Sequence, residues 1–264
     1  MNIIFFTQDD PFFVKIFFDE FFKLHKPIEE IKAIVISSPL GKKNTMKLAR
    51  QMYSFCGFID FLRIGMKYAF IKVASKNCLE KSIPVNISKR YSLKQLARAY
   101  GIDVFERNDL NSQSCRELLQ QYDPDLLISI AAPIIFKEDL IKLPRLDCIN
   151  VHNAPLPNYK GMLPSFWQLY YGEKNSGITV HKIDKGIDTG DIIRQESIPI
   201  DDHETLHDLI VKTKKMGAKI IQEVIEDFRV GKINYTRMKG KGSYFTFPTR
   251  KDVLEFRKRG RKLL

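Results

Sequence analysis

The sequence predicts an α/β fold with a doubly wound, mostly parallel, Rossmann-like sheet. Short apolar runs typical of buried strands alternate with segments whose apolar residues recur at helical spacing. An order of strand, helix, strand implies parallel pairing, with helices on both faces of an open sheet. No internal repeat or low-complexity linker interrupts this order. Such sheets bind ligands at the carboxyl ends of their strands, where we expect the functional site.

The expected elements follow one another regularly along the chain. Strands are expected at 3–7, 31–37, 103–106, 125–132 and 148–152, with helices at 11–25, 45–54, 92–101 and 114–122. A second pair of strands at 176–183 and 191–200 precedes a long helix at 204–231. Residues 232–264 are basic, end in a predicted helix and are too few for an independent domain. We therefore expect one domain over 1–231 and a short basic C-terminal extension over 232–264.

The composition is that of a soluble globular protein with a basic surface. The 264 residues are 44% hydrophobic and 28% charged, and Lys and Arg exceed Asp and Glu by 12. A basic surface favours nucleotides, phosphorylated substrates, nucleic acid or acidic lipid as partners, and lysines that contact only water are an equal alternative. The four cysteines lack paired spacing, which argues against a disulfide framework or zinc knuckle and favours a cytoplasmic setting. The N-terminus has no basic region before its apolar run, so we expect a first strand rather than a signal peptide.

Residues 57–74 form an apolar segment that carries four charges, Asp60, Arg63, Lys67 and Lys72. Four charges make a transmembrane helix too costly. One interpretation is a basic amphipathic helix that lies on a membrane or a partner protein. We favour the other, a helix that packs on the body of the protein with a solvated basic face.

Polar side chains gather where the strand at 148–152 ends. Asn150 and His152 are two residues apart, so an extended chain points both to the same side. Pro155, Pro157 and Gly161 then stiffen and bend the chain as it leaves the strand. This pattern predicts two hydrogen-bonding groups held side by side at the rim of the sheet.

A second unusual segment is the loop DKGIDTGD at 184–191, between the two later strands. Its glycines allow tight turns and close backbone approach. A turn explains the glycines, but it does not explain three aspartates in a chain that is otherwise rich in basic residues.

Together the two segments resemble the catalytic region of the 10-formyltetrahydrofolate-dependent formyltransferases. The matching residues are INVH followed by P-x-Y-x-G, and later GITVHKIDKGIDTGDI. The family includes methionyl-tRNA formyltransferase, glycinamide ribonucleotide formyltransferase and the amino-sugar nucleotide N-formyltransferases. The resemblance covers residues 125–200 closely and the remaining sheet loosely. It implies a formyl-transferring enzyme with 10-formyltetrahydrofolate as co-substrate and no metal.

The resemblance implies a catalytic trio of Asn150, His152 and Asp188. Formyl transfer to an amine passes through a tetrahedral intermediate whose oxygen becomes negative. Asn150 can donate a hydrogen bond to that oxygen, and so can a protonated His152. We expect Asp188 to keep His152 charged by raising its pKa, and to accept the proton that the amine must lose.

The resemblance also locates the folate pocket. Ile134, Ile135 and Phe136 align with the segment whose backbone lines the pterin, although core packing would also account for them. Asp184 and Gly186 belong to the loop that closes the other side of the pocket.

A substrate loop is expected to follow the strand that carries the trio. It comprises Pro155, Pro157, Tyr159 and Gly161, beside the reacting carbon. Ala154 stands where the family commonly has serine, so any acceptor contact made by that hydroxyl is in doubt.

We expect the acceptor to be an anionic amino sugar linked to a nucleotide. The tRNA enzyme carries a C-terminal barrel domain, whereas here only a short basic tail follows the long helix, so nucleic acid is possible but not favoured. The first strand lacks the Gly-rich turn that holds the phosphate of glycinamide ribonucleotide. Methionyl-tRNA formyltransferase-like activity, a formyltetrahydrofolate hydrolase and a silent folate-binding protein stay open as alternatives. The aromatic residues of 243–249 are expected to cap the core rather than to stack on a ligand, and the oligomeric state is left open.

A competing motif is HETLH at 203–207, which matches the zinc-binding pattern H-E-x-x-H. We interpret it instead as a helix start near residue 204, with Asp201 or Asp202 as the N-cap. No third ligand is evident in the sequence, so we expect no zinc.

Overall fold

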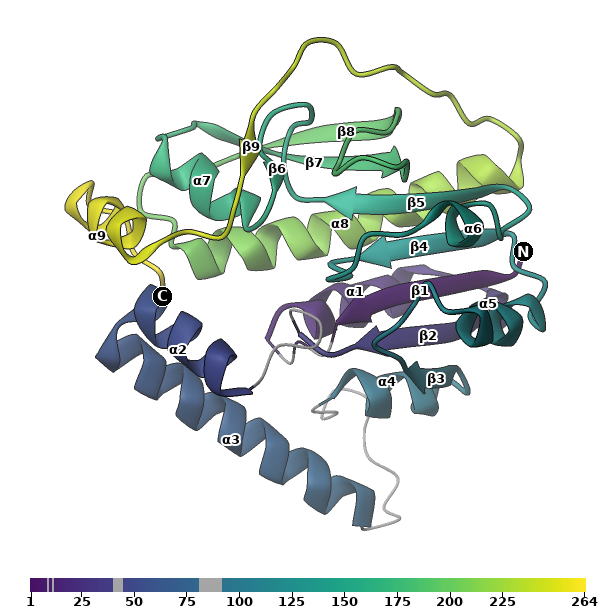
Figure 1. Ribbon diagram of the computed structural model, residues 1–264, viewed down its shortest axis with the longest axis horizontal. Helices are drawn as coiled ribbons and strands as arrows, with labels where there is room; N and C mark the ends of the chain where they lie inside the picture. Colours follow the sequence, from purple (N-terminus) through teal and green to yellow (C-terminus); the bar gives the residue numbers. More distant parts are fainter. Residues whose placement is uncertain (9, 11, 40–44, 81–91) are drawn as a thin grey trace.

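The computed structural model describes residues 1–8, 10, 12–39, 45–80 and 92–264. A seven-stranded sheet with the strand order β3-β2-β1-β4-β5-β7-β8 lies at its centre (Figure 1). Its strands are β1 (Ile3–Gln8), β2 (Ile31–Ser37), β3 (Asp103–Glu106), β4 (Leu126–Ile130), β5 (Asp147–His152), β7 (Asn175–Lys182) and β8 (Ile192–Pro199). All seven coincide with predicted strands to within two residues at each end.

The pairing within the sheet creates a natural ligand site. β1 to β5 pair in parallel, whereas β7 and β8 are antiparallel, so the predicted mostly parallel sheet is confirmed. The chain first builds outward from β1 to β3 and then returns to place β4 on the other side of β1. Ligands of open α/β sheets bind at such a reversal, outside the carboxyl ends of the strands.

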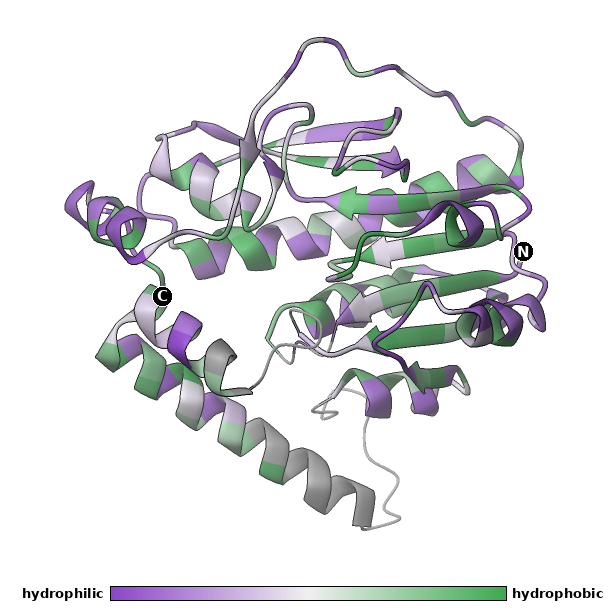
Figure 2. Ribbon diagram, in the orientation of Figure 1, coloured by the Kyte–Doolittle hydropathy of each residue, from purple (hydrophilic) through white to green (hydrophobic). Residues whose placement is uncertain are grey.

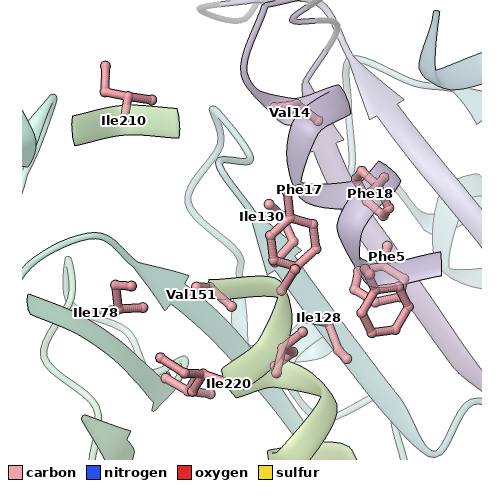
Figure 3. Packing of buried hydrophobic residues seen from close by; sticks show 14 of the residues in the cluster. Phe5, Val14, Phe17, Phe18, Ile128, Ile130, Val151, Ile178, Ile210 and Ile220 are labelled. Carbon is pink, nitrogen blue, oxygen red and sulfur yellow. The ribbon is translucent and has the colours of Figure 1, made fainter. Parts of the chain in front are cut away.

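Helices cover both faces of the sheet, as a doubly wound fold requires. One face carries α1 (Val14–Leu24), α4 (Leu93–Ala99) and α8 (Leu206–Arg229), and the other carries α5 (Gln113–Gln120) and α6 (Glu138–Ile141). Side chains alternate along β1 and so contribute to two hydrophobic cores. Ile3 and Phe5 belong to the larger core, against α1, α4 and α8, whereas Ile4 and Phe6 belong to the smaller core, against α5 and α6. Figure 3 shows Phe5, Phe17 and Phe18 in the larger core. Figure 2 shows apolar colouring along much of β1, β2 and β4.

The long helix α8 begins two residues later than predicted. Its N-cap is Thr205, whose side chain and that of Asp208 form a reciprocal capping box, so the expected N-cap at Asp201 or Asp202 is wrong. The predicted helix over 11–25 is observed as α1, and residue 11 lies outside the described residues. Five short elements among the described residues were not predicted: a 3₁₀ helix (Ile28–Glu30), α6, α7 (Pro164–Tyr170), β6 (Lys160–Gly161) and β9 (Tyr244–Phe245). Elements this short show too little periodicity to be recognised.

The C-terminal segment packs on the domain that precedes it. β9 pairs in parallel with β6, and α9 (Arg250–Lys258) buries Val253 and Phe256 in the larger core. The ring of Phe245 stacks on those of Tyr159 and Trp167, as expected for aromatic residues that cap the core. The division at residue 231 stays a prediction.

The segment 57–74 is helical and packs only some of its apolar residues against the core. It lies in α3 (Phe58–Glu80), which follows α2 (Thr45–Cys56) at the edge of the molecule (Figure 1). Phe61 and Ile64 pack against the larger core, whereas Phe58 and Leu62 are 67% and 51% exposed. The helix therefore packs on the body of the protein with Arg63 exposed, as in the favoured interpretation, and it also leaves an apolar side in water. None of the helices in the described part of the chain is long and apolar enough to cross a membrane.

Candidate active site

A cavity of about 640 Å³ opens at the carboxyl ends of the central strands. Gln8 at the end of β1, Ala131 just beyond β4 and His152 at the end of β5 all line it. All three members of the predicted trio line the same cavity, although Asp188 comes from the distant loop after β7. The position is the one that the sheet topology favours for a ligand.

Asn150 is held by the strand next to its own. β5 and β7 pair with Asn150 directly opposite His181, so both side chains leave the sheet on the same side. The Asn150 amide Nδ2 donates to His181 Nε2 at 3.1 Å, and His181 Nδ1 donates to the carbonyl of Lys182 at 2.8 Å. An amide nitrogen has two hydrogens, so Asn150 retains one donor for a ligand.

His152 lies between a backbone carbonyl and Asp188. Its Nε2 is 2.8 Å from the carbonyl oxygen of Tyr159, which can only accept, so Nε2 carries a proton. Its Nδ1 is 3.5 Å from Asp188 Oδ2. Burial lowers the pKa of His152 below its usual value, and this outweighs the attraction of Asp188, which raises the pKa. The expectation that Asp188 keeps His152 charged is therefore wrong, because burial penalises the charged form more strongly.

Asp188 is fixed and ionised. Burial alone would raise the pKa of this carboxyl group, but its interactions within the site, which include the backbone N–H of Gly161, bring it down to about 2. The Gly161 N–H donates to Oδ2 at 2.9 Å, and His181 Nε2 lies 3.5 Å from Oδ1. Asp188 also has a positive φ of 52°, which a non-glycine residue rarely adopts. Both its backbone and its side chain are therefore constrained by the site.

The loop that carries Asp188 is organised by Asp184. Its Oδ1 accepts from the backbone N–H of Gly186 at 2.9 Å and from the hydroxyl of Thr189 at 2.6 Å. A Cβ on Gly186 would lie 2.0 Å from the Thr189 hydroxyl oxygen, so the turn requires glycine. Asp184 and Gly186 both line the cavity, as predicted, and the structure gives Asp184 a further part in shaping the loop.

The predicted pterin segment lines the opposite wall. Ile134, Ile135 and Phe136 all border the cavity. Phe136 is also buried in the smaller core against Phe6, with ring centroids 5.0 Å apart, whereas Ile135 is 59% exposed. Core packing and cavity lining are thus both true of this segment.

Most residues of the predicted substrate loop lie outside the cavity lining. Among Pro155, Pro157, Tyr159 and Gly161, only Gly161 lines the cavity. The Tyr159 carbonyl accepts from His152, and its hydroxyl donates to Glu173 at 2.5 Å. Pro155 is packed so closely on β7 that a Cβ at Gly177 would lie 2.5 Å from its nitrogen, and Pro157 is similarly close to Gly242.

Replacing Gly161 with alanine is expected to abolish most of the site's activity. A Cβ there would lie 2.3 Å from the carbonyl oxygen of Phe245, and the φ of 94° is unfavourable for alanine. The shift would displace the N–H that holds Asp188. Gly172→Ala is the matched control, because Gly172 also has a positive φ, of 73°, but has open space around it. Activity and thermal unfolding of both variants check this; equal losses of activity in the two variants would contradict the steric explanation.

Among the polar residues of the cavity that were not predicted, three have a place in the proposed chemistry. His181 was part of the quoted motif, and its place at the end of β7 opposite Asn150 could have revealed it. Lys214 interrupts the apolar face of α8, between Ile210 and Ala218, and this interruption was the available signal. The third is Asn153, whose Oδ1 is buried without a hydrogen-bond partner in the described structure.

The HETLH segment does not form a helical histidine pair. His203 precedes α8, whereas the ring of His207 lies against Phe13 with centroids 5.3 Å apart. Within the residues that the structure describes, no group of three or more His, Cys, Asp or Glu side chains is arranged to hold a metal ion.

Comparison with known proteins gives one family. Residues 72–225 match the family model described as formyl transferase. The methionyl-tRNA formyltransferase of Kosmotoga olearia is 38% identical over 144 residues, which cover 54% of this chain and 46% of that protein. The corresponding enzyme of Caldanaerobacter subterraneus subsp. tengcongensis is 36% identical over 145 residues, or 53% and 46% of the two chains. The chain thus spans about half the length of the relatives that it matches.

Solved structures share the fold at lower identity. An N-formyltransferase from Helicobacter canadensis, in complex with folinic acid and dTDP-3-aminofucose, has a TM-score of 0.56 and 20% identity, and the match covers 93% of this chain and 71% of that one. The phosphoribosylglycinamide formyltransferase of Anaplasma phagocytophilum has a TM-score of 0.61 and 14% identity, with 94% and 99% coverage.

Proposed function

Because the chain belongs to the formyl transferase family, we propose that it transfers a formyl group from 10-formyltetrahydrofolate to a primary amine. The observation that carries this proposal is the convergence of Asn150, His152 and Asp188 in one cavity. The family match covers all three positions. Their chemistry suits an acyl-type transfer, which needs a donor for a developing oxyanion and an acceptor for a proton.

The proposed reaction begins when the amine attacks the formyl carbon of the donor. The carbonyl oxygen becomes negative, and the free N–H of Asn150 donates to it. His152 Nδ1 and Asp188 Oδ2 face each other at 3.5 Å with no proton between them, since the His152 proton lies on Nε2. The proton that leaves the amine can be held between these two atoms. The intermediate then collapses, the bond from carbon to N10 breaks, and the proton held between His152 and Asp188 passes to N10 as tetrahydrofolate leaves.

The donor is proposed to bind along the wall formed by Ile134, Ile135 and Phe136. These residues and the loop from Asp184 to Asp188 border the cavity on either side of the trio. An apolar slot with backbone polar groups suits a flat pterin ring, which has hydrogen-bonding groups along its edges. The Helicobacter canadensis neighbour was solved with folinic acid, which is a folate compound of the same class.

The acceptor is proposed to be an amino sugar linked to a nucleotide. Lys214, on the wall formed by α8, places a buried ammonium group in the cavity, and burial lowers its pKa to about 8 while Asp10 limits the drop. A buried cation attracts an anionic ligand strongly, because little water screens it. Tyr244 is 54% exposed and also lines the cavity, where its ring can stack on a base or sugar. The unpartnered Oδ1 of Asn153 can accept from the acceptor amine.

A second candidate is methionyl-tRNA as acceptor. The observation in its favour is the identity of 36–38% with two methionyl-tRNA formyltransferases over the catalytic segment. Both candidates share the proposed donor, trio and chemistry, and differ only in what delivers the amine.

Lys214→Met is expected to raise the KM for an anionic acceptor at least about tenfold, because a tenfold change corresponds to the loss of one modest charged contact. The KM for the folate donor should change little. Lys215→Met is the matched control, since Lys215 is the next residue on the helix but is exposed. Steady-state kinetics with both substrates varied separately will check this. A Lys214→Met variant with an unchanged acceptor KM would contradict the proposed anion contact.

Release of tetrahydrofolate, followed by absorbance, tests the proposed function. The purified chain is supplied with 10-formyltetrahydrofolate and a panel of nucleotide-linked amino sugars, and separately with methionyl-tRNA. Release that depends on an amino sugar supports the main proposal, and release that depends on methionyl-tRNA supports the second candidate. Release without any amine would indicate a hydrolase, and no release under any condition would indicate a silent binding protein.

A further inference from the structure

An exposed apolar stripe runs along α3, and none of its residues lines the active-site cavity. It comprises Phe58, Ile59, Leu62, Met66 and Val73, which are 51–67% exposed. At 100° per residue these positions fall within about a third of the helix circumference, and they extend for about 22 Å at 1.5 Å per residue. Monomeric soluble proteins rarely leave such a stripe in water unless it has a binding partner.

The orientation of this stripe is fixed by contacts on the opposite side of the helix. Phe61 and Ile64 pack against the larger core. Arg257 of α9 donates to the Cys56 carbonyl at 2.6 Å and to Asp60 at 2.9 Å, which ties the start of α3 to the C-terminal helix. The stripe therefore faces outward while the helix itself is anchored.

One basic residue borders the stripe on its outer side. Arg63 lies beside it with its side chain 67% exposed and 3.9 Å from Asp60, whereas the ammonium of Lys67 lies over the Phe12 ring, 5.7 Å from its centroid. The sequence from 58 to 73 has a single acid, Asp60, against three bases. Asp60 is only 19% exposed and is bound to Arg257, so little negative charge is left at this surface.

The catalytic family does not account for the stripe. The family match begins at residue 72, after four of the five stripe residues. None of the five lines the active-site cavity. The stripe therefore lies outside the proposed site of formyl transfer.

We propose that the α3 stripe docks the protein on an anionic lipid bilayer, with the helix in the plane of the membrane surface. The five apolar side chains would enter the boundary between headgroups and acyl chains, while Arg63 contacts the headgroup phosphates. The net charge of +12 adds attraction to an anionic surface. A second copy of the chain fits less well, because it carries the same net charge of +12 and would be repelled.

Vesicle co-sedimentation tests this proposal with the full chain. The probes are vesicles of phosphatidylcholine alone and of phosphatidylcholine with phosphatidylglycerol, at low and at physiological salt. We expect binding to the anionic vesicles, and a drop of at least tenfold in the partition coefficient for Leu62→Glu with Met66→Glu. We also expect Arg63→Glu to weaken the preference for anionic vesicles.

Matched controls separate docking from general effects of added charge. Leu146→Glu with Val230→Glu changes two apolar residues that are similarly exposed elsewhere, and should bind like the unchanged chain. All variants should retain the same thermal unfolding and the same release of tetrahydrofolate, since none of these positions lies in the cavity. The proposal is overturned if the unchanged chain does not bind anionic vesicles at low salt, or if the stripe variant binds equally well. It is likewise overturned if sedimentation instead reveals a dimer that only the stripe substitutions dissociate.

Discussion

Asp188→Asn is expected to lower turnover by about 10²- to 10⁴-fold, the range typical of a lost acid–base group. The substitution keeps the size of the side chain and an oxygen that can accept the Gly161 N–H. It removes the negative charge that sits 3.5 Å from His152 Nδ1. A proton leaving the amine would then be held by His152 alone, whose pKa is already lowered by burial. The loss should therefore appear in kcat, with little change in the KM of either substrate.

The control for this substitution is Asp191→Asn. Asp191 belongs to the same acidic loop but does not line the cavity of the trio. Its replacement should leave kcat within a fewfold of the unchanged chain. Single-turnover measurements are the appropriate check, because they report the chemical step rather than product release. An Asp188→Asn variant with nearly full activity would show that the proton takes another route.

Asn150→Ala is expected to have the second largest effect, a loss of about 10²- to 10³-fold in kcat. The substitution removes the N–H of Asn150 that would donate to the oxyanion. It also removes the hydrogen bond that His181 Nε2 accepts from Asn150. Because the donor acts mainly when the oxygen becomes negative, the KM for the folate should change little. Asn158→Ala is a suitable control, since Asn158 is exposed in the loop that follows β5. If the Asn150→Ala variant lost affinity for the folate and kept its kcat, Asn150 would be a binding residue and not an oxyanion donor.

The fold followed from the sequence because its signals are local. In β1, Ile3, Ile4, Phe5 and Phe6 are buried from both sides, and such a continuous apolar run predicts a central strand directly. Short elements such as β6 carry no comparable signal. The start of α8 was misplaced because Asp201 and Asp202 are good N-cap residues in isolation, whereas Thr205 has the partner Asp208 that completes the capping box.

The candidate site was predicted in composition but not in electrostatics. The two motifs with Asn150, His152 and Asp188 identified the trio, and the structure places all three in one cavity. The protonation of His152 depends on how deeply it is buried and on its contact with the Tyr159 carbonyl, and neither is encoded in the spacing of a motif. The position of His181 beside Asn150 depends on the pairing of β5 with β7 in the folded sheet.

Some features depend on tertiary structure alone. The sequence of α3 does not reveal which of its apolar sides faces the core, because both sides are apolar and only the docking of Phe61 and Ile64 decides between them. In the sequence, Lys214 likewise cannot be distinguished from the many other lysines. Only the packing of α8 against the end of the sheet brings it to the cavity.

The central claim is that the trio transfers a formyl group, and isotope transfer tests it most directly. The unchanged chain and the Asp188→Asn variant are each incubated with donor labelled with carbon-13 in the formyl group and with a nucleotide-linked amino sugar. The acceptor is then analysed by mass spectrometry. We predict that the unchanged chain adds one labelled formyl group to the amine and that the variant adds almost none over the same time. Equal labelling by the two proteins, or consumption of the donor without label on any amine, would contradict the account.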